Sequence, residues 1–174
     1  MIDEIQKEKI EHVVQQAIDE HGSTRDALIP ILSEVNKSFG FIPEIAFSTI
    51  RKKIHIPENK FTVSESQLFG LASFYHMFSV KPLGKHVIRF CESAPCHVMG
   101  GRQIIQALKE LLQLEPGETS NNGMWSLITT SCLGVCGVGP VILIDDEIYG
   151  NLLPEQLPEI LAKYDPSYAQ ETMI

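Results

Sequence analysis

Four cysteines stand in the sequence as two closely spaced pairs. Cys91 and Cys96 are separated by four residues, Cys132 and Cys136 by three, and 35 residues lie between the two pairs. Each pair follows a stretch that is predicted to be a β-strand, so the two cysteine loops are expected to leave one end of a sheet and converge. Four converging thiolates need a cation, and the usual ones are an iron–sulfur cluster and tetrahedral zinc.

The residues around the second pair favour the iron–sulfur cluster. Gly134, Gly137 and Gly139 surround Cys136, and small residues allow backbone N–H groups to approach sulfide and thiolate sulfurs, which tunes a reduction potential. Such hydrogen-bond donors are of less benefit to a zinc site. The cysteine spacing by itself is nevertheless compatible with a structural Cys₄ zinc site. A thiol–disulfide enzyme is the third hypothesis, and the lack of a Cys-x-x-Cys motif disfavours it.

Three other residues of the first cysteine loop admit two interpretations. Ser93, His97 and Met99 lie between or just after Cys91 and Cys96. In one interpretation they tune a cluster or contact a partner protein, and in the other they are ordinary exposed loop residues.

Composition excludes several other functions. The chain has 174 residues, 44% of them hydrophobic, which is enough for one ordinary domain or a small domain with a helical appendage. A net charge of −8 without any Lys/Arg run argues against nucleic acid as a partner. No apolar run approaches the roughly 20 residues of a membrane-spanning helix, and the N-terminal residues resemble no secretory signal, so we expect a cytoplasmic protein without direct membrane insertion. No GxGxxG or GxxxxGK[ST] motif follows a strand, so a nucleotide site is not expected.

Apolar residues recur at helical spacing in the first half of the chain. Gly22 and Gly40 stand where the first two helices would end, and Pro30 would kink the second unless that helix starts later. Ser64 with Gln67 three residues further on predicts a capping box at the start of the fourth. The expected helices cover residues 10–21, 23–39, a short stretch after residue 43, and 65–78.

The second half of the chain predicts the element order β-α-β-β-α. Together with the helical first half, this order predicts an α+β (α/β) fold for the chain. The helix is expected to open at Gly100-Gly101, and Asp145-Asp146 forms the natural turn of a hairpin. We predict a helical region over residues 1–82, a second domain over 83–165, and a C-terminal tail over 166–174 that is a loose end or a contact arm. The expected strands cover residues 86–90, 125–130, 141–144 and 147–149, and the last helix starts near residue 154.

Three stretches carry a family resemblance: ALIPILSEVNKSFGFIP at residues 27–43, FYHMFSVKPLGKHVIRFCESAPCHVMGG at 74–101, and SCLGVCGVGPVILIDDEIYGNL at 131–152. The chain resembles the thioredoxin-like [2Fe-2S] subunit of NADH dehydrogenase (complex I, 24 kDa subunit family). The same family includes the small subunits of NAD-linked and electron-bifurcating hydrogenases and of formate dehydrogenases.

The resemblance implies a fold, a cofactor and a partner. Residues 84 to about 164 would form a thioredoxin-like ferredoxin domain behind an N-terminal helical bundle, and Cys91, Cys96, Cys132 and Cys136 would ligate one [2Fe-2S] cluster. The chain would exchange single electrons with the FMN of an NADH-binding flavoprotein, in a complex with further iron–sulfur, hydrogenase or dehydrogenase subunits. It would be an oxidoreductase subunit without a substrate site of its own. The alternative is a zinc adaptor subunit without a redox role.

Overall fold

The computed structural model describes residues 4–54 and 63–170. The chain divides into two compact units, Met1–Pro82 and Leu83–Ile174, and each is described by itself. No described helix is both long and apolar enough to cross a membrane.

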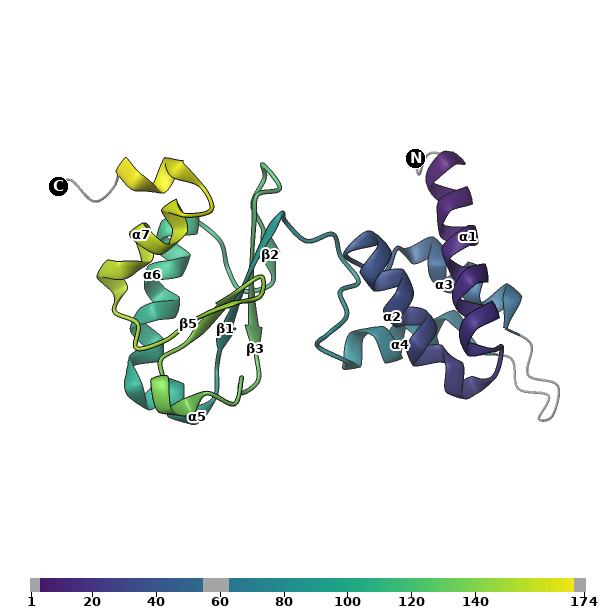
Figure 1. Cartoon of the computed structure of the whole chain (residues 1–174), viewed down its shortest axis with the longest axis horizontal. Coiled ribbons are helices and arrows are strands. Elements are labelled where there is room, and N and C mark those ends of the chain that lie inside the picture. The colour runs from purple at the N-terminus through teal and green to yellow at the C-terminus, as the bar shows by residue number, and fades with distance from the viewer. Residues whose placement is uncertain (1–3, 55–62, 171–174) are drawn as a thin grey trace. The chain divides into compact units, whose positions relative to one another are not determined.

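The first unit is a bundle of α-helices, drawn in purple to blue in Figure 1. Their apolar faces enclose one core, and Pro30 lies in the first turn of the second helix, where its missing N–H has no intrahelical acceptor to lose. That helix therefore starts later than Ser23, as Pro30 requires, after a short 3₁₀ turn. The helices are α1 (Glu4–His21), α2 (Leu28–Phe39), α3 (Glu44–Lys53) and α4 (Glu65–Phe74).

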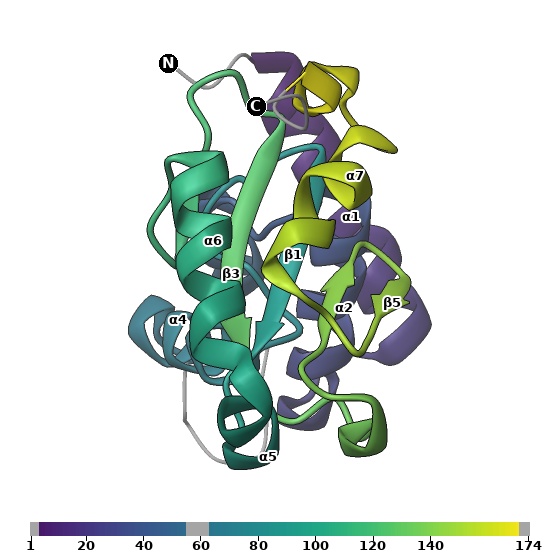
Figure 2. The ribbon, with the colours of Figure 1, turned by 90° about the vertical axis from the view of Figure 1, so that its left-hand side faces the viewer.

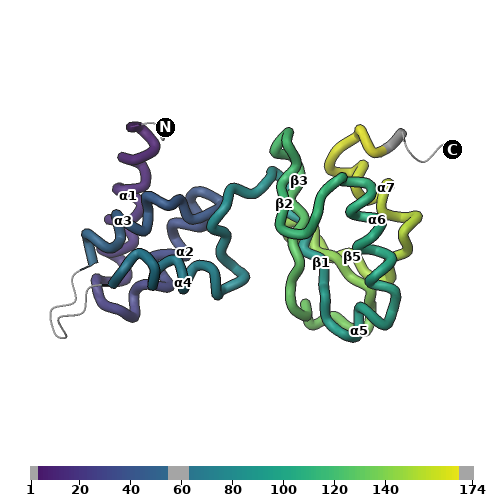
Figure 3. The backbone as a smooth tube through the Cα atoms, turned by 180° about the vertical axis from the view of Figure 1, so that it is seen from behind, coloured from purple at the N-terminus to yellow at the C-terminus, as the bar shows by residue number. Residues whose placement is uncertain are grey.

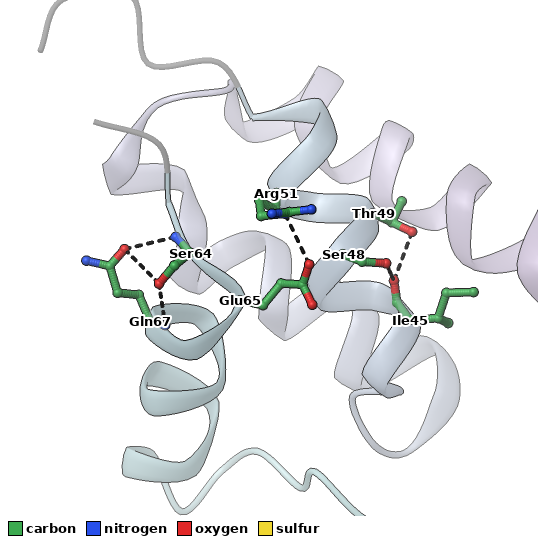
Figure 4. A network of polar contacts seen from close by, with 7 residues as sticks. All are labelled: Ile45, Ser48, Thr49, Arg51, Ser64, Glu65 and Gln67. Atoms are coloured by element: carbon green, nitrogen blue, oxygen red, sulfur yellow. Dashed lines mark hydrogen bonds and ion pairs between the residues drawn. The ribbon is translucent and has the colours of Figure 1, made fainter. Parts of the chain in front are cut away.

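The start of α4 confirms the predicted capping box (Figure 4). The Gln67 backbone N–H donates to Ser64 Oγ at 3.2 Å, and the Ser64 backbone N–H donates to Gln67 Oε1 at 3.0 Å. An ion pair of 3.1 Å between Arg51 Nε and Glu65 Oε1 joins α3 to the first turn of α4. The helix ends at Phe74, earlier than predicted, although Phe78 is still buried in the same core.

The second unit is a five-stranded sheet with the strand order β2-β3-β1-β4-β5. The neighbouring strands β1 and β3 are paired in parallel, with Cys91 opposite Thr130, and the other three pairings of the sheet are antiparallel. The helices α6 (Arg102–Leu112) and α7 (Leu157–Ala162) lie over the same face of the sheet (Figure 2). The strands are β1 (His86–Cys91), β2 (Glu118–Thr119), β3 (Trp125–Thr130), β4 (Ile142–Ile144) and β5 (Glu147–Tyr149).

Strand alternation decides which residues of β1 face the helices. Ile88 and Phe90 are buried in the core that includes α6 and α7, together with Trp125 and Leu127 of β3. Because side chains alternate along a strand, Cys91 points away from that core. It belongs instead to a small buried group with Cys96 and Val141.

Two parts of the second unit differ from the sequence prediction. The loop before β3 contains the short strand β2, which pairs antiparallel with β3. The C-terminal segment, which we expected to be a loose end or a contact arm, forms the 3₁₀ helix η5 (Pro166–Gln170). The Tyr168 ring lies edge-on to Trp125 with centroids 6.1 Å apart, so this part of the segment packs on the domain. Residues 171–174 lie outside the described residues.

Candidate iron–sulfur centre

The first cysteine loop is built from two unusual turns at the end of β1. A single α-helical turn, α5 (Ala94–Cys96), is followed by a π-helical turn, η2 (His97–Gly101), and α6 begins directly afterwards. Figures 1 and 3 show α5 at one end of the sheet, with the C-terminal η5 segment (yellow) at the other. The helix predicted to begin at Gly100-Gly101 therefore begins just after Gly101. The two turns that precede it, α5 and η2, were not predicted.

The second cysteine loop leaves β3 at the same end of the sheet. Its Cys132 is exposed, and Cys136 begins a short 3₁₀ turn, η3 (Cys136–Val138). The backbone N–H of Asn151 donates to the Val138 carbonyl at 2.6 Å, which fixes this loop to the chain that follows β5.

The structure arranges the four cysteines as two pairs. The sulfurs of Cys132 and Cys136 are 3.2 Å apart, and the thiols of Cys91 and Cys96 are hydrogen-bonded to one another. Cys136 also interacts electrostatically with Cys91 and with Cys96, so the two pairs lie near one another. Within residues 4–54 and 63–170, no three His, Cys, Asp or Glu side chains converge in a way that could hold a single metal ion.

Hydrogen bonds and burial give the thiols unequal acidities. Burial raises the pKa of the Cys91 thiol, but backbone N–H donors of Ser93 and Leu133 outweigh it and bring that pKa below its ordinary value. Burial, then the neighbouring Cys91 thiol, raises the pKa of Cys96 to about 11. The pKa of Cys136 is raised by its hydrogen bond to Cys132 and by partial burial. Metal binding would displace the protons of the thiols, because cysteine ligates metal as the thiolate.

The donor set fits a [2Fe-2S] cluster, which has two irons and takes two cysteine thiolates on each. Two neighbouring pairs of cysteines supply that number of thiolates. Backbone N–H groups also point at the sulfurs, as the glycine-rich loop predicted, and Gly134 N–H donates to Cys132 Sγ at 3.4 Å. The donors at Leu133 and Val141 were missed, because a backbone N–H carries no sequence signal.

A mixed sheet with two helices on one face, and with paired cysteines on two loops at one end, defines a small iron–sulfur ferredoxin domain. The model of the thioredoxin-like [2Fe-2S] ferredoxin family matches residues 14–165. The chain belongs to that family.

Several similar proteins are subunits of larger oxidoreductases. One subunit of the NADH-quinone oxidoreductase of Escherichia coli (strain K12) is 36% identical over 159 residues, which cover 91% of this chain and 89% of that one. The HndA subunit of the NADP-reducing hydrogenase of Solidesulfovibrio fructosivorans is 29% identical over 151 residues, or 87% and 84% of the two chains.

A solved structure shares the fold. The crystal structure of an NAD⁺-reducing [NiFe]-hydrogenase in the H₂-reduced state superposes with a TM-score of 0.62 at 18% identity, over 78% of this chain and 22% of that chain. Together, these comparisons confirm the predicted family, the thioredoxin-like fold and one [2Fe-2S] cluster as the cofactor. They also identify the chain as an electron-transfer protein of the kind found as an oxidoreductase subunit.

Proposed function

We propose that Cys91, Cys96, Cys132 and Cys136 hold the [2Fe-2S] cluster and that the chain relays single electrons within a multisubunit NAD-linked oxidoreductase. Its electron partner would be the FMN of an NADH-binding flavoprotein subunit. The observation that carries the proposal is the placement of the thiols as two neighbouring pairs, on loops that leave the same end of the sheet. When bound, the cluster supplies the one-electron redox change, while the protein supplies ligands, hydrogen bonds and burial.

Each cysteine pair would serve one iron. Cys91 and Cys96 are 1% and 0% exposed, whereas Cys132 is exposed. The two irons would therefore lie in different surroundings, with the Cys132–Cys136 side nearer to water and to any approaching partner. Electron exchange with a second protein is expected through that side.

The assembly is inferred from the relatives. Their names place them in an NADH-quinone oxidoreductase and an NADP-reducing hydrogenase, so we expect the flavoprotein and further iron–sulfur, hydrogenase or dehydrogenase subunits as partners here. Free thiols that ligate metal persist in reducing compartments, which supports a cytoplasmic location.

The cluster is tested by low-temperature electron paramagnetic resonance of anaerobically purified protein, before and after reduction with dithionite. We expect a signal only after reduction, with about one spin per chain, because the oxidised [2Fe-2S] centre is diamagnetic. Replacing any one of the four cysteines with Ser should shift the reduction potential or abolish the signal. A colourless protein that contains zinc instead of iron would contradict the proposal and favour the zinc adaptor.

The partner is tested with NADH and an NADH-binding flavoprotein subunit that contains FMN. NADH should leave the cluster of the isolated chain oxidised and should reduce it once the flavoprotein is added, because the chain has no nucleotide motif of its own. A flavoprotein stripped of FMN serves as the control. Equal reduction with and without FMN would rule out the flavin as the electron donor.

A further inference from the structure

Met99 and Cys96, both in the first cysteine loop, approach Gly139 of the second loop. A Cβ atom placed on Gly139 would be 3.3 Å from Met99 Sδ and 3.4 Å from Cys96 Sγ. The thioether and the Cys96 sulfur therefore both border the same side of the Gly139 backbone. A side chain at residue 139 would crowd both sulfurs and the carbonyl oxygen of Cys136.

Cys96 is shielded on its inner side by apolar residues. It is 0% exposed and packs in a small group with Cys91 and Val141. Met99, by contrast, is 47% exposed, so its side chain lies at the boundary between this group and water.

The backbone holds Met99 in this place. Gly100, the next residue, has a φ of 105°, in the left-handed region that glycine adopts without strain. A Cβ on Gly101 would lie 2.7 Å from the Cys96 carbonyl oxygen, so the π-helical turn packs directly on Cys96. Both glycines therefore shape the turn that contains Met99 and follows Cys96.

We propose that Met99 is a positioning residue that keeps water away from the Cys96 side of the cluster and thereby lowers its reduction potential. The inference rests on the proposed function, because it needs the cluster on these cysteines. Reduction adds one negative charge to the centre, and water stabilises the more highly charged form. Excluding water therefore disfavours reduction. A thioether suits this position, because it is apolar, fills irregular gaps and offers the thiolate no hydrogen-bond donor.

The test compares variants of the full-length chain by redox titration, followed by the resonance signal of the reduced cluster. Met99→Ala should raise the potential, with about a tenfold larger ratio of reduced to oxidised cluster at a fixed applied potential, or about 59 mV for one electron. Met99→Leu, which keeps an apolar side chain of similar size, should stay near the wild type. Val98→Ala is the matched control, since Val98 precedes Met99 in the same turn and is 84% exposed.

A second readout measures water directly. In D₂O, the deuterium modulation of the reduced signal should increase in Met99→Ala and in Met99→Gln, but not in Met99→Leu. If either polar or truncated variant loads a cluster with the wild-type potential and modulation, the inference is wrong. If both fail to load a cluster while Met99→Leu loads one, the need for an apolar cover is supported. A wild-type chain without any cluster would instead overturn the proposed function.

Discussion

Two glycines of the first cysteine loop show how closely single residues control the candidate centre. At Gly100 the constraint is a positive φ of 105°, whereas at Gly101 it is space. A Cβ on Gly101 would approach the Cys96 carbonyl carbon to 3.1 Å and the Phe90 ring to 3.3 Å. Contacts this short oblige the backbone around Cys96 to move.

Gly101→Ala should therefore lower the free energy of unfolding by about 1–3 kcal/mol, the usual cost of overpacking, and should reduce the iron content of the purified protein. Urea unfolding and iron analysis measure the two effects. Gly137→Ala is the control, because a Cβ there meets nothing within 4 Å, and it should change stability by less than about 0.5 kcal/mol. Equal behaviour of the two variants would show that the close approach at Gly101 does not matter.

At the scale of elements, one carboxylate joins the last strand to the end of α7. Glu147 Oε2 accepts hydrogen bonds from the hydroxyls of Tyr149 and Tyr164, and these two hydroxyls are 3.0 Å apart. The Lys163 ammonium lies 5.2 Å from the centre of the Tyr149 ring. Because Glu147 and Tyr149 belong to β5 while Tyr164 follows α7, this network holds the helix against the edge of the sheet.

The network makes a prediction for pH dependence. The hydrogen bonds from Tyr149 and then Tyr164 bring the pKa of Glu147 below its ordinary value of 4.5. A carboxyl whose pKa is lower in the folded state stabilises the fold above its unfolded pKa and loses that contribution as the pH falls through the folded value. Wild type should therefore be more stable than Glu147→Gln near neutral pH, and the difference should disappear in acid.

Urea unfolding across a pH series measures that difference. Glu155→Gln, at an exposed carboxyl of the 3₁₀ turn Pro154–Gln156, serves as the control. A difference between wild type and Glu147→Gln that persists unchanged into acid would show that the Glu147 charge is not what stabilises the fold.

Local sequence patterns predicted the elements that depend on local chemistry. The strands β3 and β5 have their predicted bounds, because β-branched and aromatic residues are bounded there by clear turn residues. The capping box is likewise a local motif. The strand β2 was missed, since a two-residue strand exists only through its pairing with β3. The turns α5 and η2 were missed because they are too short to show periodicity.

The candidate site was predictable for a different reason. Only cysteine carries a thiol, so the four candidate ligands and their two loops could be found from residue type and spacing. The family resemblance supplied their roles as cluster ligands. The parallel pairing of β1 with β3 brings the loops together. The backbone donor at Val141 and the approach of Met99 and Cys96 to Gly139 required the folded backbone, because they join residues from separate segments of the chain.

For the whole molecule, the main feature is that the apolar cores are separate. The buried residues of the helical unit run from Ile10 to Phe78, and those of the second unit begin after it. Each described unit thus has a core of its own, which is what an independently folding domain needs. We infer that the residues from Leu83 onward fold and bind the cluster alone.

The fragment 83–174 should therefore give a cooperative unfolding transition, about two irons per chain and the reduced signal of the full chain. The shorter fragment 83–165 is the matched comparison, because it lacks Tyr168, whose ring packs on Trp125. It should unfold at lower urea concentration, since burial of aromatic surface stabilises a core. If the fragment 83–174 is unfolded with iron present, the helical unit is part of the folding domain.

The parallel pairing of β1 and β3 also divides the sheet into two ends with different tolerances. Both cysteine loops leave the carboxyl ends of these strands, while the exposed turn at residues 121–123 lies before β3, at the opposite end. Insertions in that turn leave the distance between the cysteine pairs unchanged. Related proteins should therefore differ in the number of residues at this turn more than in the cysteine loops. The same turn is the natural place to attach an electrode tether or a fluorophore, because a graft there stays a strand's length away from the cofactor.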